Sequence, residues 1–211
     1  MTFEEAMQAA AQSANAAVWK TVEKYNSGGV FDEPEISTYL ISQLDSKMSG
    51  QIGGLNWSST ILRNGKGKAA EEKRIGADIL LHVSVDTPVE RYSKGVLIQA
   101  KKAEPNRLAS AAVMTELAEQ CQKMLSHTAS SFVMSYSTKE FRAGSATRFT
   151  GTKNRDIYRV CTWTTYRFFL ELFRCPVGDP RISSGRVEEL PVPYVIHLSA
   201  KGELNVDGYH D

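Results

Sequence analysis

Three polar residues, Asp78, Gln99 and Lys101, lie in or beside apolar stretches that have the composition of buried strands. Asp78 lies at the start of one such stretch, whereas Gln99 and Lys101 lie near the end of the next. Alternate residues of a strand project to one face, so antiparallel pairing of the two stretches would bring all three together. Charged side chains are almost never buried unless they are paired or bound to a ligand. The set therefore predicts a metal site or a structural ion pair between Asp78 and Lys101, and the ion pair leaves Gln99 without a role.

The elements that would position these residues follow from hydrophobic periodicity. Apolar residues recur at helical spacing over residues 3–25, from Asp32 to about residue 48, and over residues 107–126. Short apolar or β-branched segments typical of strands occupy residues 55–62, 77–85, 95–102 and 130–137. From residue 32 onward the order is helix, three strands, helix, strand. We expect an α/β fold with a central mixed sheet flanked by helices.

The chain predicts a single domain, residues 1–211, in which residues 138–211 form a C-terminal α/β elaboration. This part contains an apolar helix at 163–173, which we interpret as a core helix, with an interface between chains as the alternative. A loop from Pro176 to Gly185 follows it, and a terminal hairpin is predicted to turn at Lys201-Gly202.

The charge of the chain is balanced, with 25 basic and 24 acidic residues and a net charge of +1. Attraction to nucleic acid must therefore come from local clusters, and two basic loops, Arg63 to Arg74 and Arg142 to Arg159, are candidates. The residues that we predict to contact phosphate are Lys102, Arg148, Lys153 and Arg155. Their alternative is an ordinary solvated surface.

The cysteine, histidine and hydropathy patterns argue against a zinc site, a disulfide framework and a membrane span. The three cysteines fit no zinc motif or disulfide framework, the four histidines are scattered, and we expect reduced thiols and no zinc. The N-terminus lacks the basic start and apolar run of a secretion signal. No segment approaches the roughly 18–20 apolar residues that cross a bilayer. We expect a cytoplasmic protein without a membrane partner.

The motifs GAD at 76–78 and QAK at 99–101 resemble the PD-(D/E)xK, or restriction-endonuclease-like, nuclease superfamily in its Gln-x-Lys, Mrr-like variant. The resemblance covers about residues 32–137, in the order α-β-β-β-α-β, with the N-terminal helix 3–25 outside it. It implies an endonuclease dependent on Mg²⁺ or Mn²⁺ that hydrolyses phosphodiester bonds, in DNA rather than RNA. It also implies a defence or genome-processing system, with a homodimer or other defence-system subunits as partners.

The resemblance assigns roles to individual residues. Asp78, Gln99, the backbone carbonyl of Ala100 and Glu35 would bind the metal, because hard divalent cations take oxygen ligands. Lys101 would lie near the attacking water and the scissile phosphate. Since Gln99 stands where many members have a carboxylate, we expect weaker metal binding unless Glu35 restores the charge.

Two of these assignments have competing interpretations. Glu35 also completes a capping box that begins at Asp32, and Glu33 is then the substitute at the metal. Gln120, on the following helix, either supports the site or faces solvent. Because Gln99 replaces a carboxylate, the chain has an alternative interpretation as a catalytically inactive nuclease fold that binds nucleic acid or another protein.

Overall fold

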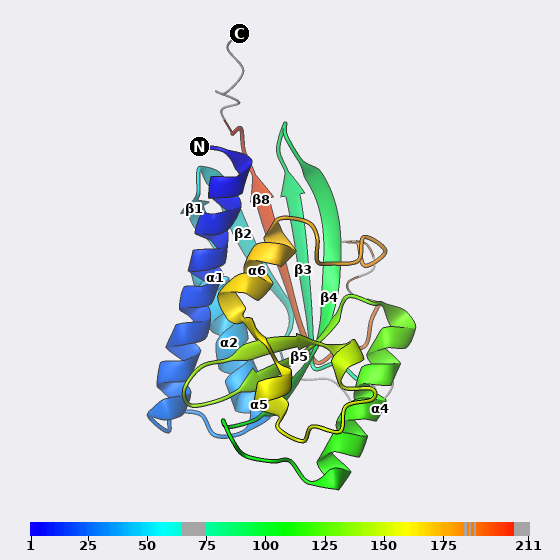
Figure 1. Ribbon diagram of the computed structural model, residues 1–211. Coiled ribbons are helices and arrows are strands. Elements are labelled where there is room, and N and C mark those ends of the chain that lie inside the picture. The colour runs from blue at the N-terminus through cyan, green and yellow to red at the C-terminus, as the bar shows by residue number, and fades with distance from the viewer. Residues whose placement is uncertain (65–74, 184, 186, 188, 205–211) are drawn as a thin grey trace.

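The computed structural model describes residues 1–64, 75–183, 185, 187 and 189–204. Within them an eight-stranded mixed sheet has helices on both faces, so the fold is α/β, as predicted (Figure 1). The strands are β1 (Gly50–Ile52), β2 (Leu55–Asn64), β3 (Ile79–Asp86), β4 (Arg91–Lys102), β5 (Ser131–Tyr136), β6 (Arg142–Ser145), β7 (Trp163–Thr164) and β8 (Tyr194–Lys201). The helices are α1 (Phe3–Asn26), α2 (Glu33–Lys47), α4 (Ala111–His127), α5 (Ile157–Val160) and α6 (Thr165–Phe173), with a 3-10 turn, η1, at Ala146–Arg148.

The strand order is β1-β2-β8-β3-β4-β5-β6-β7. β3 and β4 pair antiparallel, and β4 pairs parallel with β5 after the crossover through α4. β8 lies between β2 and β3, antiparallel to the first and parallel to the second. The predicted first arm of a terminal hairpin, residues 194–201, pairs instead with β2 and β3, so the hairpin prediction is wrong there. The predicted second arm, after Gly202, extends beyond the described residues. A strand of the expected C-terminal elaboration lies inside the sheet.

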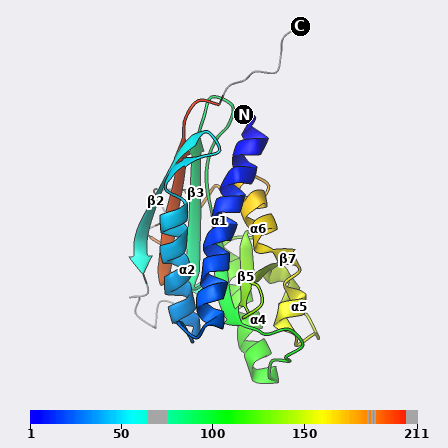
Figure 2. The same ribbon diagram turned by 90° about the vertical axis from the view of Figure 1, so that its left-hand side faces the viewer.

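Two layers of helix cover the sheet. α1 and α2 lie side by side on one face, where they share a core with α6, and α4 covers part of the other face (Figure 2). Caps fix where these helices begin: Thr2 forms a capping box at α1, and Asp32 accepts a hydrogen bond from the Glu35 backbone N–H at α2. The apolar stripe of each helix then faces the sheet.

The apolar helix predicted at 163–173 is observed as α6, preceded by the short strand β7. Phe168, Phe169, Leu172 and Phe173 are each at most 1% exposed and pack into the core shared with α1. The core interpretation is therefore the one that fits, because these side chains are already covered within one chain. No helix among the described residues is long and apolar enough to span a membrane.

Candidate active site

The antiparallel pairing of β3 and β4 places Asp78 beside Gln99. Ile79 pairs with Ile98, and the Asp78 backbone N–H donates to the Ile98 carbonyl over 2.9 Å. Gln99 Nε2 donates to Asp78 Oδ2 over 2.6 Å and to the Ala100 carbonyl over 3.2 Å, and the Ala100 backbone N–H also donates to Asp78 Oδ2, over 2.8 Å. Gln99 is only 2% exposed, so this bonding satisfies a buried amide. The structure thus brings Asp78, Gln99 and Ala100 together.

Lys101 lies beside Glu33, at the first position of α2. Lys101 Nζ is 3.6 Å from Glu33 Oε2, and the Lys101 side chain is only 15% exposed. The other carboxylate oxygen of Glu33 accepts the backbone N–H of Lys102 over 2.7 Å. Glu33 therefore ties the N-terminus of α2 to the end of β4, and it is Glu33 rather than Asp78 whose ion pair with Lys101 the structure records.

Glu35 does not lie at the site, in contrast to the prediction. Its carboxylate accepts the Phe31 backbone N–H over 2.8 Å, while its own N–H donates to Asp32. Asp32 caps α2 through the Glu35 N–H, while the Glu35 carboxylate binds the residue before the cap, Phe31, instead of closing the box on Asp32. The carboxylate is therefore used at the helix start, as in the competing interpretation. The acidic residue that α2 contributes is Glu33, which was considered only as a substitute.

Two adjoining pockets, each of about 300 Å³, share Asp78, Gln99 and Gln120 in their walls. The first is completed by residues from α2, β4 and the start of β8: Glu33, Pro34, Ser37, Lys101, Pro193 and Tyr194. The second is completed by residues before β3 and on α4: Gly76, Glu116, Glu119 and Lys123. Gln120 therefore faces the site rather than solvent. Its Oε1 is buried and accepts no hydrogen bond from a described residue.

Gly76 allows the start of β3 to approach α4 closely. It adopts a φ of +78°, and a Cβ at this position would lie 2.3 Å from the Gln120 carbonyl oxygen. A side chain is excluded on both grounds, since positive φ disfavours L-residues and the space is filled by backbone. The first residue of the GAD motif thus positions Asp78 next to Gln120.

The start of α2 is held against the sheet by tyrosine hydroxyls. Tyr194 Oη donates to the Pro34 carbonyl over 2.9 Å, and the Tyr194 backbone N–H donates to the Asp78 carbonyl over 3.0 Å. Ser37 Oγ and Tyr136 Oη are 3.0 Å apart, and burial raises the pKa of the Tyr136 hydroxyl, which therefore stays protonated. Glu33 and Asp78 are consequently positioned by a shared, buried framework.

The donor set of the site is compatible with a hard divalent cation. Asp78 and Glu33 supply carboxylates, and the orphaned Gln120 Oε1 is an acceptor that a cation would satisfy. Gln99 presents its amide nitrogen to Asp78, so its oxygen would bind a cation only after the amide turns over. The set is poor in charge: no group of three or more His, Cys, Asp or Glu among the described residues is placed to hold a metal ion.

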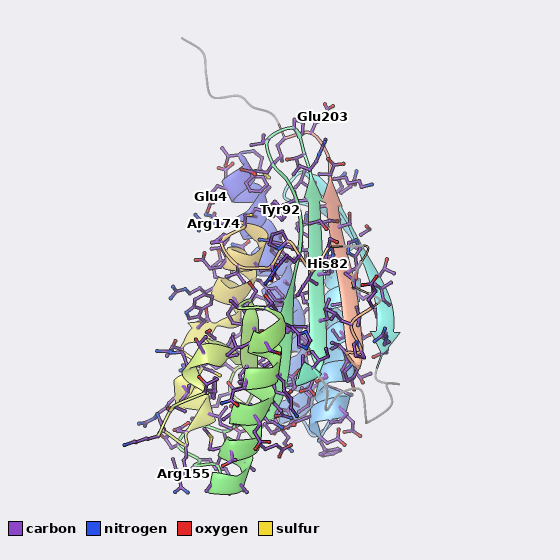
Figure 3. The ribbon with its side chains drawn as sticks, turned by 90° about the vertical axis from the view of Figure 1, so that its right-hand side faces the viewer. Glu4, His82, Tyr92, Arg155, Arg174 and Glu203 are labelled. Atoms are coloured by element: carbon purple, nitrogen blue, oxygen red, sulfur yellow. The ribbon has the colours of Figure 1, made fainter. Side chains whose placement is uncertain are left out.

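The predicted phosphate contacts fall into two kinds. Arg148 Nη1 donates to the Val160 carbonyl over 3.2 Å and to Thr162 Oγ1 over 2.5 Å, so this residue supports the chain locally. Lys153 and Arg155 are exposed, and Arg155 projects beside the lower end of α4 (Figure 3). Lys102 Nζ donates to the Phe31 carbonyl. Of the other predicted basic loop, residues 65–74 lie outside the described residues.

A histidine pair was missed by the sequence analysis. His82, in the middle of β3 (Figure 3), and His197 on β8 approach within 2.6 Å through their Nδ1 atoms, and His82 Nε2 is 3.1 Å from Ser93 Oγ. Burial, together with the neighbouring His197, lowers the pKa of His82 to about 3. The three cysteines are free, as expected, with Cys121 and Cys161 buried and Cys175 exposed.

Comparisons with protein-family models, with curated proteins and with solved structures found no match to this chain. Any assignment of function therefore depends on the residues and geometry described above.

Proposed function

We propose that this chain is a restriction-endonuclease-like nuclease that uses Mg²⁺ or Mn²⁺ to hydrolyse phosphodiester bonds in DNA. The observation that carries the proposal is the convergence of Asp78, Gln99, Lys101 and Glu33 on one pocket, at the paired ends of β3 and β4. Two partly exposed carboxylates, a lysine and a buried amide in one pocket suit a reaction in which negative charge grows on phosphate oxygens.

Each residue has a task in this proposal. Asp78 and Glu33, with amide or backbone oxygens of Gln99, Gln120 and Ala100, would hold the cation, which supplies an activated water and neutralises phosphate charge. Lys101, whose ammonium lies 3.6 Å from Glu33, would stabilise the charge that develops on the phosphate. The tyrosine framework under α2 would keep Glu33 aligned with Asp78.

The test is cleavage of supercoiled plasmid by wild type, Asp78→Asn and Lys101→Ala at equal concentration, with Mg²⁺, Mn²⁺ or EDTA. We expect metal-dependent nicking that each substitution lowers by about a hundredfold or more, as the loss of a transition-state charge contact does. The control is Lys47→Ala, at the far end of α2. A wild type that never cuts and whose melting temperature does not respond to either cation would refute the proposal.

The two acidic residues of α2 form a matched pair for a second experiment. We expect Glu33→Gln to lower cleavage and the metal-induced rise in melting temperature, because it removes a carboxylate from the pocket. Glu35→Gln should leave both cleavage and stability nearly unchanged, since the Gln amide oxygen can still accept the Phe31 N–H. The opposite pattern, with activity sensitive only to Glu35, would show that the metal role belongs to Glu35.

The hydrogen bonds around Asp78 also favour a second candidate function, a nuclease fold that binds nucleic acid without cutting it. Asp78 Oδ2 already accepts bonds from Gln99 and from the Ala100 backbone, an arrangement that is self-sufficient without a cation. For such a protein we expect DNA binding that is equal in EDTA and in Mg²⁺, and no cleavage under any condition of the plasmid assay.

A duplex cut on both strands would need two sites, so the proposal includes a homodimer or a complex with other defence-system subunits. The plasmid assay reports on this directly. Nicked circles that accumulate before linear DNA indicate single sites that act independently, whereas direct linearisation indicates paired sites.

A further inference from the structure

A separate pocket of about 410 Å³ lies where α1 ends and α4 begins, at the lower end of the molecule in Figure 1. Its volume falls in the roughly 300–1,000 Å³ range of small-ligand sites. Its apolar wall contains the Tyr25 ring, Leu108, Val113 and Ile157. Leu108 is 60% exposed and Val113 is 38% exposed, which makes this one of the places where the described chain shows large apolar side chains to solvent.

Cations from separate segments surround this apolar wall. Lys102 and Arg107 line the pocket, and Lys102 Nζ is 5.7 Å from the centre of the Tyr25 ring. The Ala109 backbone N–H donates to the Arg155 carbonyl over 2.9 Å, so the exposed Arg155 and Lys153 belong to the segment that adjoins the pocket. Among the described residues, none forms an ion pair or side-chain hydrogen bond with Arg107, Lys153 or Arg155. These cations are therefore available to a ligand.

The acidic residue of the lining keeps its charge but is held by hydrogen bonds to a neighbouring segment, and it is outnumbered by the cations Lys102 and Arg107. Glu104, the acidic residue of the lining, accepts hydrogen bonds from Ser137 Oγ and from both the backbone N–H and hydroxyl of Thr138. The first turn of α4, which contributes Val113, contains no acidic residue, so the partial positive charge of this helix end is uncompensated. The pocket thus combines an aromatic ring, apolar walls and a positive rim.

We propose that this pocket binds one unstacked nucleotide of a single-stranded nucleic-acid segment, with the base against Tyr25 and the phosphate near Lys102 and Arg107. Aromatic rings stack on bases only where those bases are free of a duplex, and cations at the rim hold the backbone. A duplex would not enter a pocket of this size, which is why the inference concerns a single strand.

The pocket adjoins the candidate active site through two neighbouring residues. Lys101 lines the active-site pocket and Lys102 lines this one, and the Lys102 backbone N–H donates to Glu33. In the proposed arrangement, a strand whose nucleotide lies against Tyr25 would continue around the end of β4, where Lys101 and Lys102 project to opposite faces, towards Asp78. This orientation depends on the proposed nuclease function, whereas binding in the pocket can be measured without it.

The experiment is fluorescence anisotropy of a short fluorescein-labelled oligothymidylate with the full chain in EDTA, where no cleavage occurs. We expect Tyr25→Leu and Arg107→Ala each to raise the Kd about tenfold, the effect of losing one stacked base or one phosphate contact. Arg107→Ala should also reduce the slope of log Kd against log salt by about 0.7. The matched controls, Tyr39→Leu on α2 and Arg91→Ala at the β3–β4 turn, should leave the Kd within about twofold.

A further variant tests the pocket independently, in case Tyr25→Leu prevents folding. Val113→Asp places a carboxylate in the first turn of α4, where it suits the helix but repels phosphate, and it should weaken binding at least as much as Arg107→Ala. An unchanged Kd in Arg107→Ala and Val113→Asp would overturn the inference, as would equal losses in Arg91→Ala, which would indicate unspecific attraction.

Failure of this inference differs visibly from failure of the proposed function. Oligothymidylate binding that depends on Tyr25, in a protein that cuts no plasmid, would preserve the pocket and reject the nuclease. Metal-dependent cleavage with binding that ignores Tyr25 and Arg107 would do the reverse.

Discussion

The Gln99 amide occupies a position in which its nitrogen bonds two of the oxygens assigned to the metal, Asp78 Oδ2 and the Ala100 carbonyl. If the Gln99 amide rotated by half a turn, its oxygen would replace its nitrogen beside Asp78 Oδ2 and the Ala100 carbonyl oxygen. Three oxygens would then lie close together. Oxygens so placed repel one another unless a cation lies among them. Gln99 thus stabilises the partly buried Asp78 carboxylate without a cation, at the expense of affinity for one.

We predict that Gln99→Glu exchanges stability for metal affinity. Without a cation, two carboxylates would be in contact and the Asp78 bond would be lost, which should lower the free energy of unfolding by about 1–3 kcal/mol. With Mg²⁺ the extra charge should enlarge the rise in melting temperature. The measurement is thermal unfolding with and without Mg²⁺, with Gln122→Glu on the exposed side of α4 as the control. A Mg²⁺ response no larger than that of wild type would contradict a metal role for position 99.

At the scale of elements, the contact between the start of β3 and α4 sets the width of the site. Gly76 lies against the backbone of α4, because a Cβ added there would lie 2.3 Å from the Gln120 carbonyl oxygen. Any side chain there would push α4 away from Asp78 and separate the walls that the two pockets share.

Gly76→Ala should therefore destabilise the protein by about 1–3 kcal/mol and lower any cleavage activity, from combined backbone strain and overlap with Gln120. Gly151→Ala is the matched control, since a Cβ there meets nothing within 4 Å. Urea unfolding of both variants checks the prediction. Equal stabilities would mean that α4 shifts at no cost and that the close approach does not position Asp78.

Local patterns in the sequence were sufficient to predict most elements but not their order in the sheet. Periodicity located α1, α2, α4 and the strands on either side of Asp78 and Gln99, with boundaries that differ by a few residues. The place of β8 was not predictable in this way, because an apolar strand carries no local sign of which neighbours it pairs with. The short strands β1 and β7 hold too few residues to show alternation.

In the candidate site, contacts between neighbouring elements were predictable from the sequence, whereas contacts set by hydrogen bonding or by distant strands were not. Asp78 and Gln99 were predictable because their strands follow one another and pair across a turn. The choice between Glu33 and Glu35 was not, since both lie in one helical turn and a hydrogen bond from Phe31 decides which carboxylate caps the helix. His82 and His197 are 115 residues apart and meet only because β8 enters the sheet next to β3.

At the scale of the whole molecule, this histidine pair links stability to pH. The folded chain keeps His82 neutral, because its pKa is lowered to about 3, whereas the unfolded chain takes up a proton below about pH 6.5. The unfolded state therefore binds more protons between these values, and the free energy of unfolding falls as pH decreases.

We expect a loss of about 2 kcal/mol from His82 between pH 7 and pH 5, with stability greatest above pH 6.5. Urea unfolding at the two pH values should show this difference in wild type and a smaller one in His82→Gln. His127→Gln, at the exposed end of α4, should retain the wild-type difference. A pH dependence that survives unchanged in His82→Gln would assign it to other groups.

The central place of β8 also bears on how the protein is made. A nascent chain that has emerged only as far as residue 193 contains β2 and β3 but not the strand that joins them, so each presents an unpaired edge. Tyr194, which holds Pro34 and Asp78 in place, arrives with that strand. The catalytic machinery that we propose would therefore stay unassembled on the ribosome until β8 has emerged and paired with β2 and β3.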